Sequence, residues 1–272
     1  MMIFMFSQSR AVLIALEALT ALFMMTRAYD GAGALSICLV LLIGSALSFL
    51  IANAYAGILH HRYLLVLYAL QRPEEFVRAY EPLLACKWIP KNVRFTLTAY
   101  LSNGYAAKGD FSRARELLES GPVVSKRQAH ASALILCGNR ASIALAEGAQ
   151  AEARAQLERM EQLLSSSPFP AKKLAAQQTI FRTQTAQLHI LSGDAHVCDC
   201  DALREESKKP GSALRKTELN YFIGQAYIQL NQLSFAKEYL AAAAQGNEIY
   251  LSRLAASALR ALKNDCAKPA KK

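Results

Sequence analysis

The residues best suited to chemistry lie in one eight-residue stretch, DAHVCDCD, which runs from Asp194 to Asp201. It supplies imidazole, thiolate and carboxylate groups, which are ligands for zinc and other soft metal ions. The candidate metal ligands are therefore His196, Cys198 and Cys200. Structural zinc sites, however, usually combine two C-x₂₋₄-C elements, and the other cysteines stand alone in this sequence. We expect no bound metal or other cofactor here, but a helix turn in which Cys198 is a small buried residue.

No catalytic motif accompanies this stretch. The sequence has no P-loop, no GxSxG nucleophile elbow and no HExxH zinc-protease motif. His60 and His61 directly follow a long apolar run, a position that a membrane interface explains more simply than ligation does. His130 and His189 lie in helical patterns. We therefore expect that the protein is not an enzyme.

The elements that carry these residues begin with two apolar runs. From Ala34 to Leu59 there are 26 consecutive residues without a charge. Because a bilayer core of about 30 Å needs roughly 20 helical residues, this run is long enough to span it. The first run, over about 11–28, is weaker, and glycines and an aspartate in Tyr29–Gly33 predict a turn between the runs. Residues 1–59 are thus predicted to form a transmembrane hairpin.

One carboxylate complicates the first run. Glu17 lies at membrane depth, where we expect it to be protonated or hydrogen-bonded to Ser45 or Asn53 of the second helix. A cleaved signal peptide is the alternative for this run, with Arg10 before the apolar part and the small residues Ala32–Ala34 at a cleavage site. Glu17 inside the apolar part counts against that alternative.

The charge distribution predicts an orientation. The net charge is +10, and the chain after Leu59 carries 29 basic and 19 acidic residues. Basic residues also follow the second run closely, whereas the short connection between the runs has one Arg and one Asp. The positive-inside rule therefore places the C-terminal domain in the cytoplasm, at the inner or plasma membrane of a bacterial-type cell. The six scattered cysteines agree with a reducing compartment.

The chain beyond Leu59 is predicted to be all-α. Alanine and leucine dominate, apolar residues recur at i, i+3 and i+4, and Pro or Gly separates the segments. We expect a helical domain over 60–262, ending in a helix over Glu248–Leu262, and then a disordered basic tail over 263–272.

Two segments of this domain match each other, Ala99–Leu118 and Tyr221–Leu240. Each has a small residue (Ser102, Gly224), a Tyr three positions on, an Ala nine positions after the Tyr, and a Leu four positions later. This pattern resembles the tetratricopeptide repeat, in which helix pairs stack into a solenoid. Two degenerate copies lie between them, and the turn positions of the four copies are Gly109, Gly148, Gly193 and Asn231. We expect about four to five helix pairs.

The resemblance implies a concave face that binds peptides or protein segments. The groove positions of the family correspond here to Ala99, Asn103, Ala106, Gln187, Tyr221, Gln225 and Ile228. The face lacks the paired basic residues with which some members of the family hold a carboxylate terminus.

Together these features predict a membrane-tethered scaffold or adaptor. Its partners would be a protein or peptide and the lipid bilayer, with anionic lipid head groups as a further possibility. An exported cell-envelope assembly factor with the same helical domain is the alternative. Nucleic acid is the least favoured partner, because the basic residues are mixed with Glu and Asp.

Overall fold

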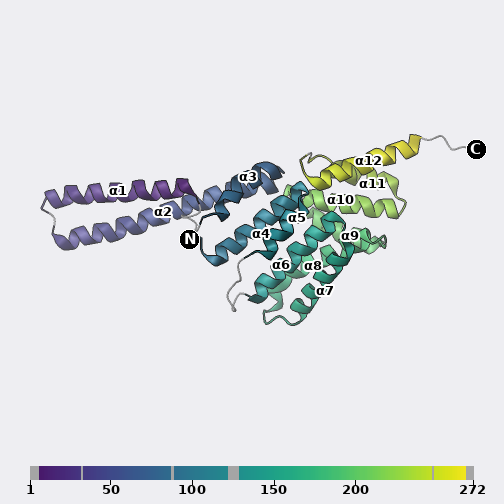
Figure 1. Cartoon of the computed structure of the whole chain (residues 1–272), viewed down its shortest axis with the longest axis horizontal. Coiled ribbons are helices and arrows are strands. Elements are labelled where there is room, and N and C mark those ends of the chain that lie inside the picture. The colour runs from purple at the N-terminus through teal and green to yellow at the C-terminus, as the bar shows by residue number, and fades with distance from the viewer. Residues whose placement is uncertain (1–5, 32, 87–88, 122–128, 247, 268–272) are drawn as a thin grey trace, which may run out of the picture.

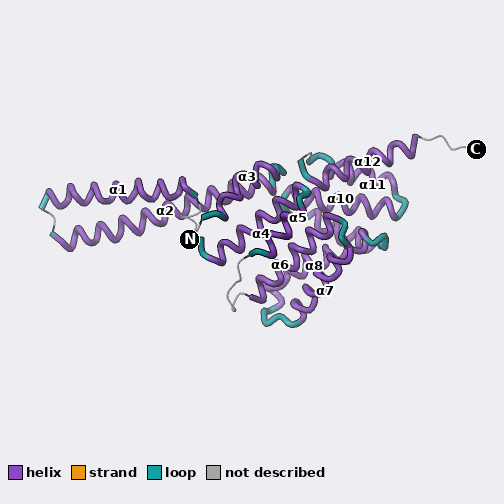
Figure 2. Tube along the Cα trace, in the orientation of Figure 1, coloured by secondary structure: helices purple, strands orange, loops and turns teal. Residues whose placement is uncertain are grey.

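The protein is all-α in the residues that the structure describes. These residues, in a computed structural model, are 6–31, 33–86, 89–121, 129–246 and 248–267. They form twelve α-helices and contain no strand (Figure 2), which confirms that this part of the chain is all-α. A hairpin of two long helices, α1 (Ser7–Tyr29) and α2 (Ala34–Tyr68), extends from one end of a packed helical domain (Figure 1).

Both hairpin helices are long and apolar enough to cross a membrane. The most apolar part of α1 has no residue buried inside the protein, and that of α2 has very few. Met25, Leu35 and Leu42, for example, are each more than 70% exposed. Contiguous exposed apolar surface of this kind marks a site of contact with a membrane or another protein. The two predicted apolar N-terminal helices are therefore present, and either could span a bilayer.

The hairpin is held by close contacts between its helices. Phe6, just before α1, stacks on Tyr63 of α2 with ring centroids 5.7 Å apart. Gly44 leaves room for the Thr20 side chain, which a Cβ at this position would strike. Ser45 Oγ donates a hydrogen bond of 2.9 Å to Glu17 Oε2. The prediction that Glu17 is hydrogen-bonded within the hairpin is therefore confirmed.

Helix α2 continues beyond the predicted span. It does not stop at Leu59 but runs unbroken to Tyr68, a length of 35 residues. At 1.5 Å per residue this is about 52 Å, well over the roughly 30 Å of a bilayer core. Leu59 and Leu67 join one buried cluster with Phe76 and Tyr80 of α3 (Pro73–Leu84). The hairpin therefore enters the domain as a continuous helix, with no linker between them.

The remaining helices each pack on the next one along the chain. They are α4 (Lys91–Lys108), α5 (Phe111–Glu119), α6 (Ala129–Glu147), α7 (Gln150–Ser165), α8 (Ala171–Leu191), α9 (Val197–Lys208), α10 (Ala213–Gln229), α11 (Leu233–Ala243) and α12 (Tyr250–Ala267). Helix α12 therefore ends five residues beyond the expected Leu262, and of the expected tail only 268–272 lies outside the described residues.

The predicted turn positions are confirmed by backbone geometry. Gly109, Gly148, Gly193 and Asn231 have φ values of 97°, 90°, 84° and 56°. This left-handed region suits glycine and, next best, asparagine, and it commonly ends a helix. Each of the four positions accordingly follows the first helix of a pair, so the repeat spacing located the turns correctly.

The positions where paired helices cross were predicted correctly in three copies. Ala114, Ala153 and Ala236 are fully buried. The prediction that Cys198 is the equivalent buried residue is wrong, because Cys198 is exposed and Cys200 is buried instead. Five residues separate α8 from α9, compared with two between α4 and α5. The longer connection moves the buried position of α9 along the chain.

Candidate functional site

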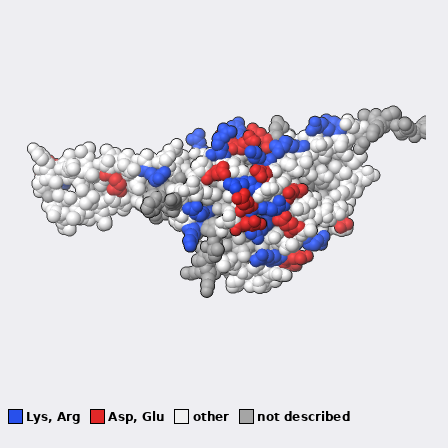
Figure 3. All heavy atoms as spheres, viewed as in Figure 1, with Lys and Arg blue, Asp and Glu red and all other residues white. Residues whose placement is uncertain are grey.

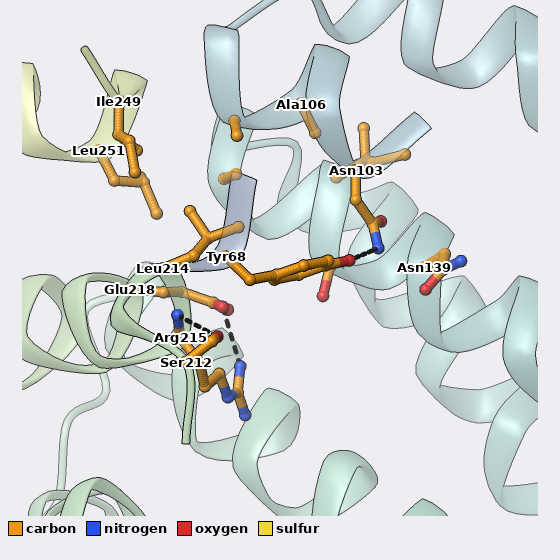
Figure 4. Close-up of a pocket in the computed structure, with 14 residues that line it drawn as sticks. Tyr68, Asn103, Ala106, Asn139, Ser212, Leu214, Arg215, Glu218, Ile249 and Leu251 are labelled. Atoms are coloured by element: carbon orange, nitrogen blue, oxygen red, sulfur yellow. Dashed lines mark hydrogen bonds and ion pairs between the residues drawn. The ribbon is translucent and has the colours of Figure 1, made fainter. Parts of the chain in front are cut away.

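A pocket of about 170 Å³ is formed by helices that are far apart in the sequence. Its walls come from the end of α2, from α4 and α6, from the start of α10 and from the segment that leads into α12 (Figure 4). It is lined by Tyr68, Asn103, Ala106, Ala107, Asn139, Ser142, Ile143, Ala146, Ser212, Leu214, Arg215, Glu218, Ile249 and Leu251. Engineered apolar cavities of about 150 Å³ hold one benzene, so this space suits a single large side chain.

The walls formed by α4, α6 and α10 belong to a row of neighbouring helices, in which α6 contacts α4 and α8, and α8 contacts α10. Asn103 of α4 meets Tyr68 at the end of α2. Two hydrogen bonds from the Gln184 amide join α8 to α6, one to the Gly138 carbonyl (2.9 Å) and one to Ser142 Oγ (2.8 Å). Gln184 is almost fully buried behind the pocket wall, and it therefore fixes the position of Ser142.

The polar groups of the pocket are mostly paired with one another. Asn103 Nδ2 donates to the Tyr68 hydroxyl at 3.1 Å. Arg215 forms an ion pair with Glu218 at 2.9 Å, and buried Gln187 donates a second hydrogen bond to Glu218. The Ser212 side chain caps α10 by accepting from the Arg215 backbone N–H. Because the one arginine and the one carboxylate of the pocket neutralise each other, the pocket has no net charge.

This arrangement provides polar and apolar groups for binding a ligand. Asn139 and Ser142 can exchange hydrogen bonds with the backbone or polar groups of a ligand. Ala106, Ile143 and Leu214 provide apolar wall. Among the described residues that line the pocket there is no histidine and no cysteine, the usual general base and the strongest nucleophile of enzyme sites.

The C-terminal helices close one side of the pocket by contacting the N-terminal ones. Gln71, after α2, donates to Thr217 of α10 at 2.7 Å. Arg253 of α12 donates to the Lys108 carbonyl at the end of α4. The Tyr250 ring meets Phe111 edge-on, with centroids 5.0 Å apart. Together these contacts place the start of α12 over the pocket.

Comparison of the chain with protein-family models, with curated proteins and with solved structures finds no match.

The predicted groove residues lie in different environments, and only some of them line the pocket. Asn103 and Ala106 line the pocket, whereas Ala99 and Gln187 are buried, Gln187 directly behind Glu218. Gln225 is half-buried and lies outside the pocket lining.

Tyr221 and Ile228 lie in a different environment. Both pack against the apolar cluster that joins α10 and α11 to α12. Burial also raises the pKa of the Tyr221 hydroxyl. Helix α12 thus covers the α10 positions that the resemblance assigned to an open groove.

Several pocket residues were not predicted. Ser142 follows the small residue Ala141 as Asn103 follows Ser102, so the repeat correspondence could have identified it. Tyr68, Arg215, Glu218 and the segment around Ile249 carry no such signal. They reach the pocket because the end of the chain folds back toward the end of α2.

The predicted metal ligands are not brought together. His196 caps the start of α9, and Asp199 accepts hydrogen bonds from the His196 backbone and from His189 Nδ1. Cys198 is exposed, while Cys200 is buried in the apolar cluster of α8–α11, where burial raises its thiol pKa. Within the described residues, no three His, Cys, Asp or Glu side chains are placed to hold one metal ion.

Proposed function

We propose that this protein is a membrane-tethered scaffold. Helices α1 and α2 cross the bilayer as a hairpin, and the domain lies on the cytoplasmic side, where its pocket binds a segment of a partner protein. The exposed apolar surface of the hairpin supports the anchoring. The uncharged pocket, with apolar walls and amide and hydroxyl groups among its lining residues, supports peptide recognition.

A tetratricopeptide-like solenoid is part of this proposal. The left-handed turn residues, the fully buried alanines that follow three of these turns and the contacts between α4, α6, α8 and α10 support it. In such a solenoid the first helices of the pairs line the binding face. The pocket is bounded by three of these helices, α4, α6 and α10, together with α2.

The observation that carries the proposal is the position of Tyr68. This residue ends the long apolar helix α2, and it also lines the pocket with residues of α4, α6 and α10. Anchor and binding site therefore share one helix.

Filling the pocket tests the binding role. Ala106→Phe places a ring in the pocket, and we expect it to abolish co-purification of a partner from mild detergent. Ser112→Phe is the matched control, because Ser112 is exposed on α5. Partners that co-purify equally with both variants would contradict the pocket as the binding site.

A topology experiment tests the location. A reporter fused after Lys272 should be active only on the cytoplasmic side. Activity only outside the cytoplasm would reject this proposal and favour the exported assembly factor.

A further inference from the structure

Three basic residues flank a buried cluster where the hairpin joins the domain. Arg10 lies one turn after Phe6, which stacks on Tyr63, and Arg62 precedes that tyrosine. Lys91 begins α4, and along the long axis of the molecule α4 starts close to the start of α1 (Figure 1). Ile89, two residues before Lys91, belongs to the same buried cluster as Phe6. We call Arg10, Arg62 and Lys91 the basic collar.

The collar residues carry charge that no described side chain neutralises. All three side chains are exposed, and none forms an ion pair with a described residue. By contrast, four basic residues near the C-terminal ends of α2 and α4 and in the first turns of α5 each form an ion pair with a glutamate. These residues are Arg72, Lys108, Arg113 and Arg115. In Figure 3 blue atoms lie at the hairpin end of the domain, and blue and red atoms are mixed over its middle.

No acidic residue lies within one helical turn of Arg10, Arg62 or Lys91 along the chain. The first turn of α4 has no acidic residue, although the helix dipole favours one there and disfavours Lys91. At this end of α5 the acidic residue is Glu119. Gly121, just after it, lies near Thr98, two turns along α4 from Lys91. The position of Lys91 is therefore not explained by helix stability or by an internal partner.

We propose that the basic collar binds the phosphate groups of anionic phospholipids in the leaflet on the domain side. The inference rests on the proposed membrane anchoring, which places the collar at head-group depth. The apolar hairpin leaves the domain at this end, so the nearest external anions would be lipid phosphates. A basic residue near an anionic surface gains attraction within about 10 Å, the Debye length at ordinary salt.

Lipid titration of the full-length protein tests this proposal. Native mass spectrometry in mild detergent would measure binding of phosphatidylglycerol and phosphatidylcholine. We expect phosphatidylglycerol to bind more tightly, and we expect its Kd to rise at least about fivefold in Arg10→Gln/Arg62→Gln/Lys91→Gln. The matched control is Arg154→Gln/Arg260→Gln/Lys263→Gln, which removes three exposed charges on α7 and α12 and should leave the Kd unchanged.

Two failures are distinguishable. The collar proposal fails if the native protein and the collar variant bind phosphatidylglycerol equally, or if the control variant loses as much affinity as the collar variant. The membrane anchoring still holds in that case, provided that the protein stays in vesicles after alkaline carbonate treatment. Release of the native protein from vesicles by carbonate overturns the membrane anchoring, and the collar with it.

Discussion

The side-chain amide of Asn103 donates a hydrogen bond to the hydroxyl of Tyr68 at 3.1 Å, joining α4 to the last residue of the long hairpin helix. Both residues line the pocket, so the bond sets the distance between two of its walls. The Tyr68 ring also meets the Tyr100 ring edge-on, which holds it in place.

Removing this hydrogen bond should destabilise the domain modestly. We expect Tyr68→Phe to lower the free energy of unfolding by about 0.5–1.5 kcal/mol, because the Asn103 amide loses its acceptor. A double-mutant cycle with Asn103→Ala, measured by denaturant unfolding in detergent, should give a coupling energy of similar size. Tyr29→Phe is the control, since Tyr29 is 94% exposed. Additive effects would show that the bond is not formed.

Two turn glycines should differ in what they tolerate. Gly109 and Gly148 both have positive φ, so alanine costs about 1–2 kcal/mol of strain at either position. A Cβ at Gly148 meets no atom within 4 Å, whereas one at Gly109 would lie 2.6 Å from the Tyr250 ring. We therefore expect Gly109→Ala to cost more and to increase hydrogen exchange in α12. Equal unfolding energies and unchanged exchange would contradict the contact between α12 and this turn.

Cysteine reactivity should separate two neighbouring thiols. Cys198 is exposed, whereas Cys200 is buried and its thiol pKa is raised by that burial. A raised pKa leaves less of the reactive thiolate at a given pH, so Cys200 needs higher pH as well as access. We expect iodoacetamide at pH 8 to label Cys198 quickly and Cys200 only after denaturation, as read by peptide mass spectrometry. Simultaneous labelling of both thiols in folded protein would contradict the orientation of α9, in which Cys200 faces the core and Cys198 faces solvent.

Loss of the Glu17 partner should weaken the hairpin. Ser45→Ala removes the donor to Glu17, and hydrogen bonds between transmembrane helices contribute about 0.6 kcal/mol on average and at most about 1.7. We expect a small but measurable fall in the unfolding midpoint in detergent. Ser36→Ala, elsewhere on the same helix, should cause a smaller change. A larger fall for Ser36→Ala would argue against this pair.

The sequence was most informative where local chemistry determines the structure. Glycine and, next, asparagine are favoured where φ is positive, so Gly109, Gly148, Gly193 and Asn231 could be identified as turns. The need for a small residue at a helix crossing identified Ala114 and Ala236. The prediction that Cys198 is buried failed, because the repeat pattern does not determine how many residues connect α8 to α9.

The pocket was harder to predict, because which residues line it depends on how the row of helices curves. Asn103 and Ala106 were found from their repeat positions, but the same positions in α10 are covered by α12. How far successive helix pairs rotate decides whether the two ends of the domain meet. That rotation depends on the packing of many side chains, and no short motif encodes the contact between Gln71 and Thr217.

Because α2 is unbroken, it determines how far the pocket would lie from the membrane in the proposed anchoring. For a span that ends at Leu59, Tyr68 stands nine residues further on, or about 14 Å above the bilayer core. An extended chain covers about 3.3–3.6 Å per residue, so four or five residues reach that level from a neighbouring membrane helix. A partner that carries its recognition segment directly after its own span could therefore reach the pocket, whereas a segment buried within a bulky folded domain would be kept out by the bilayer.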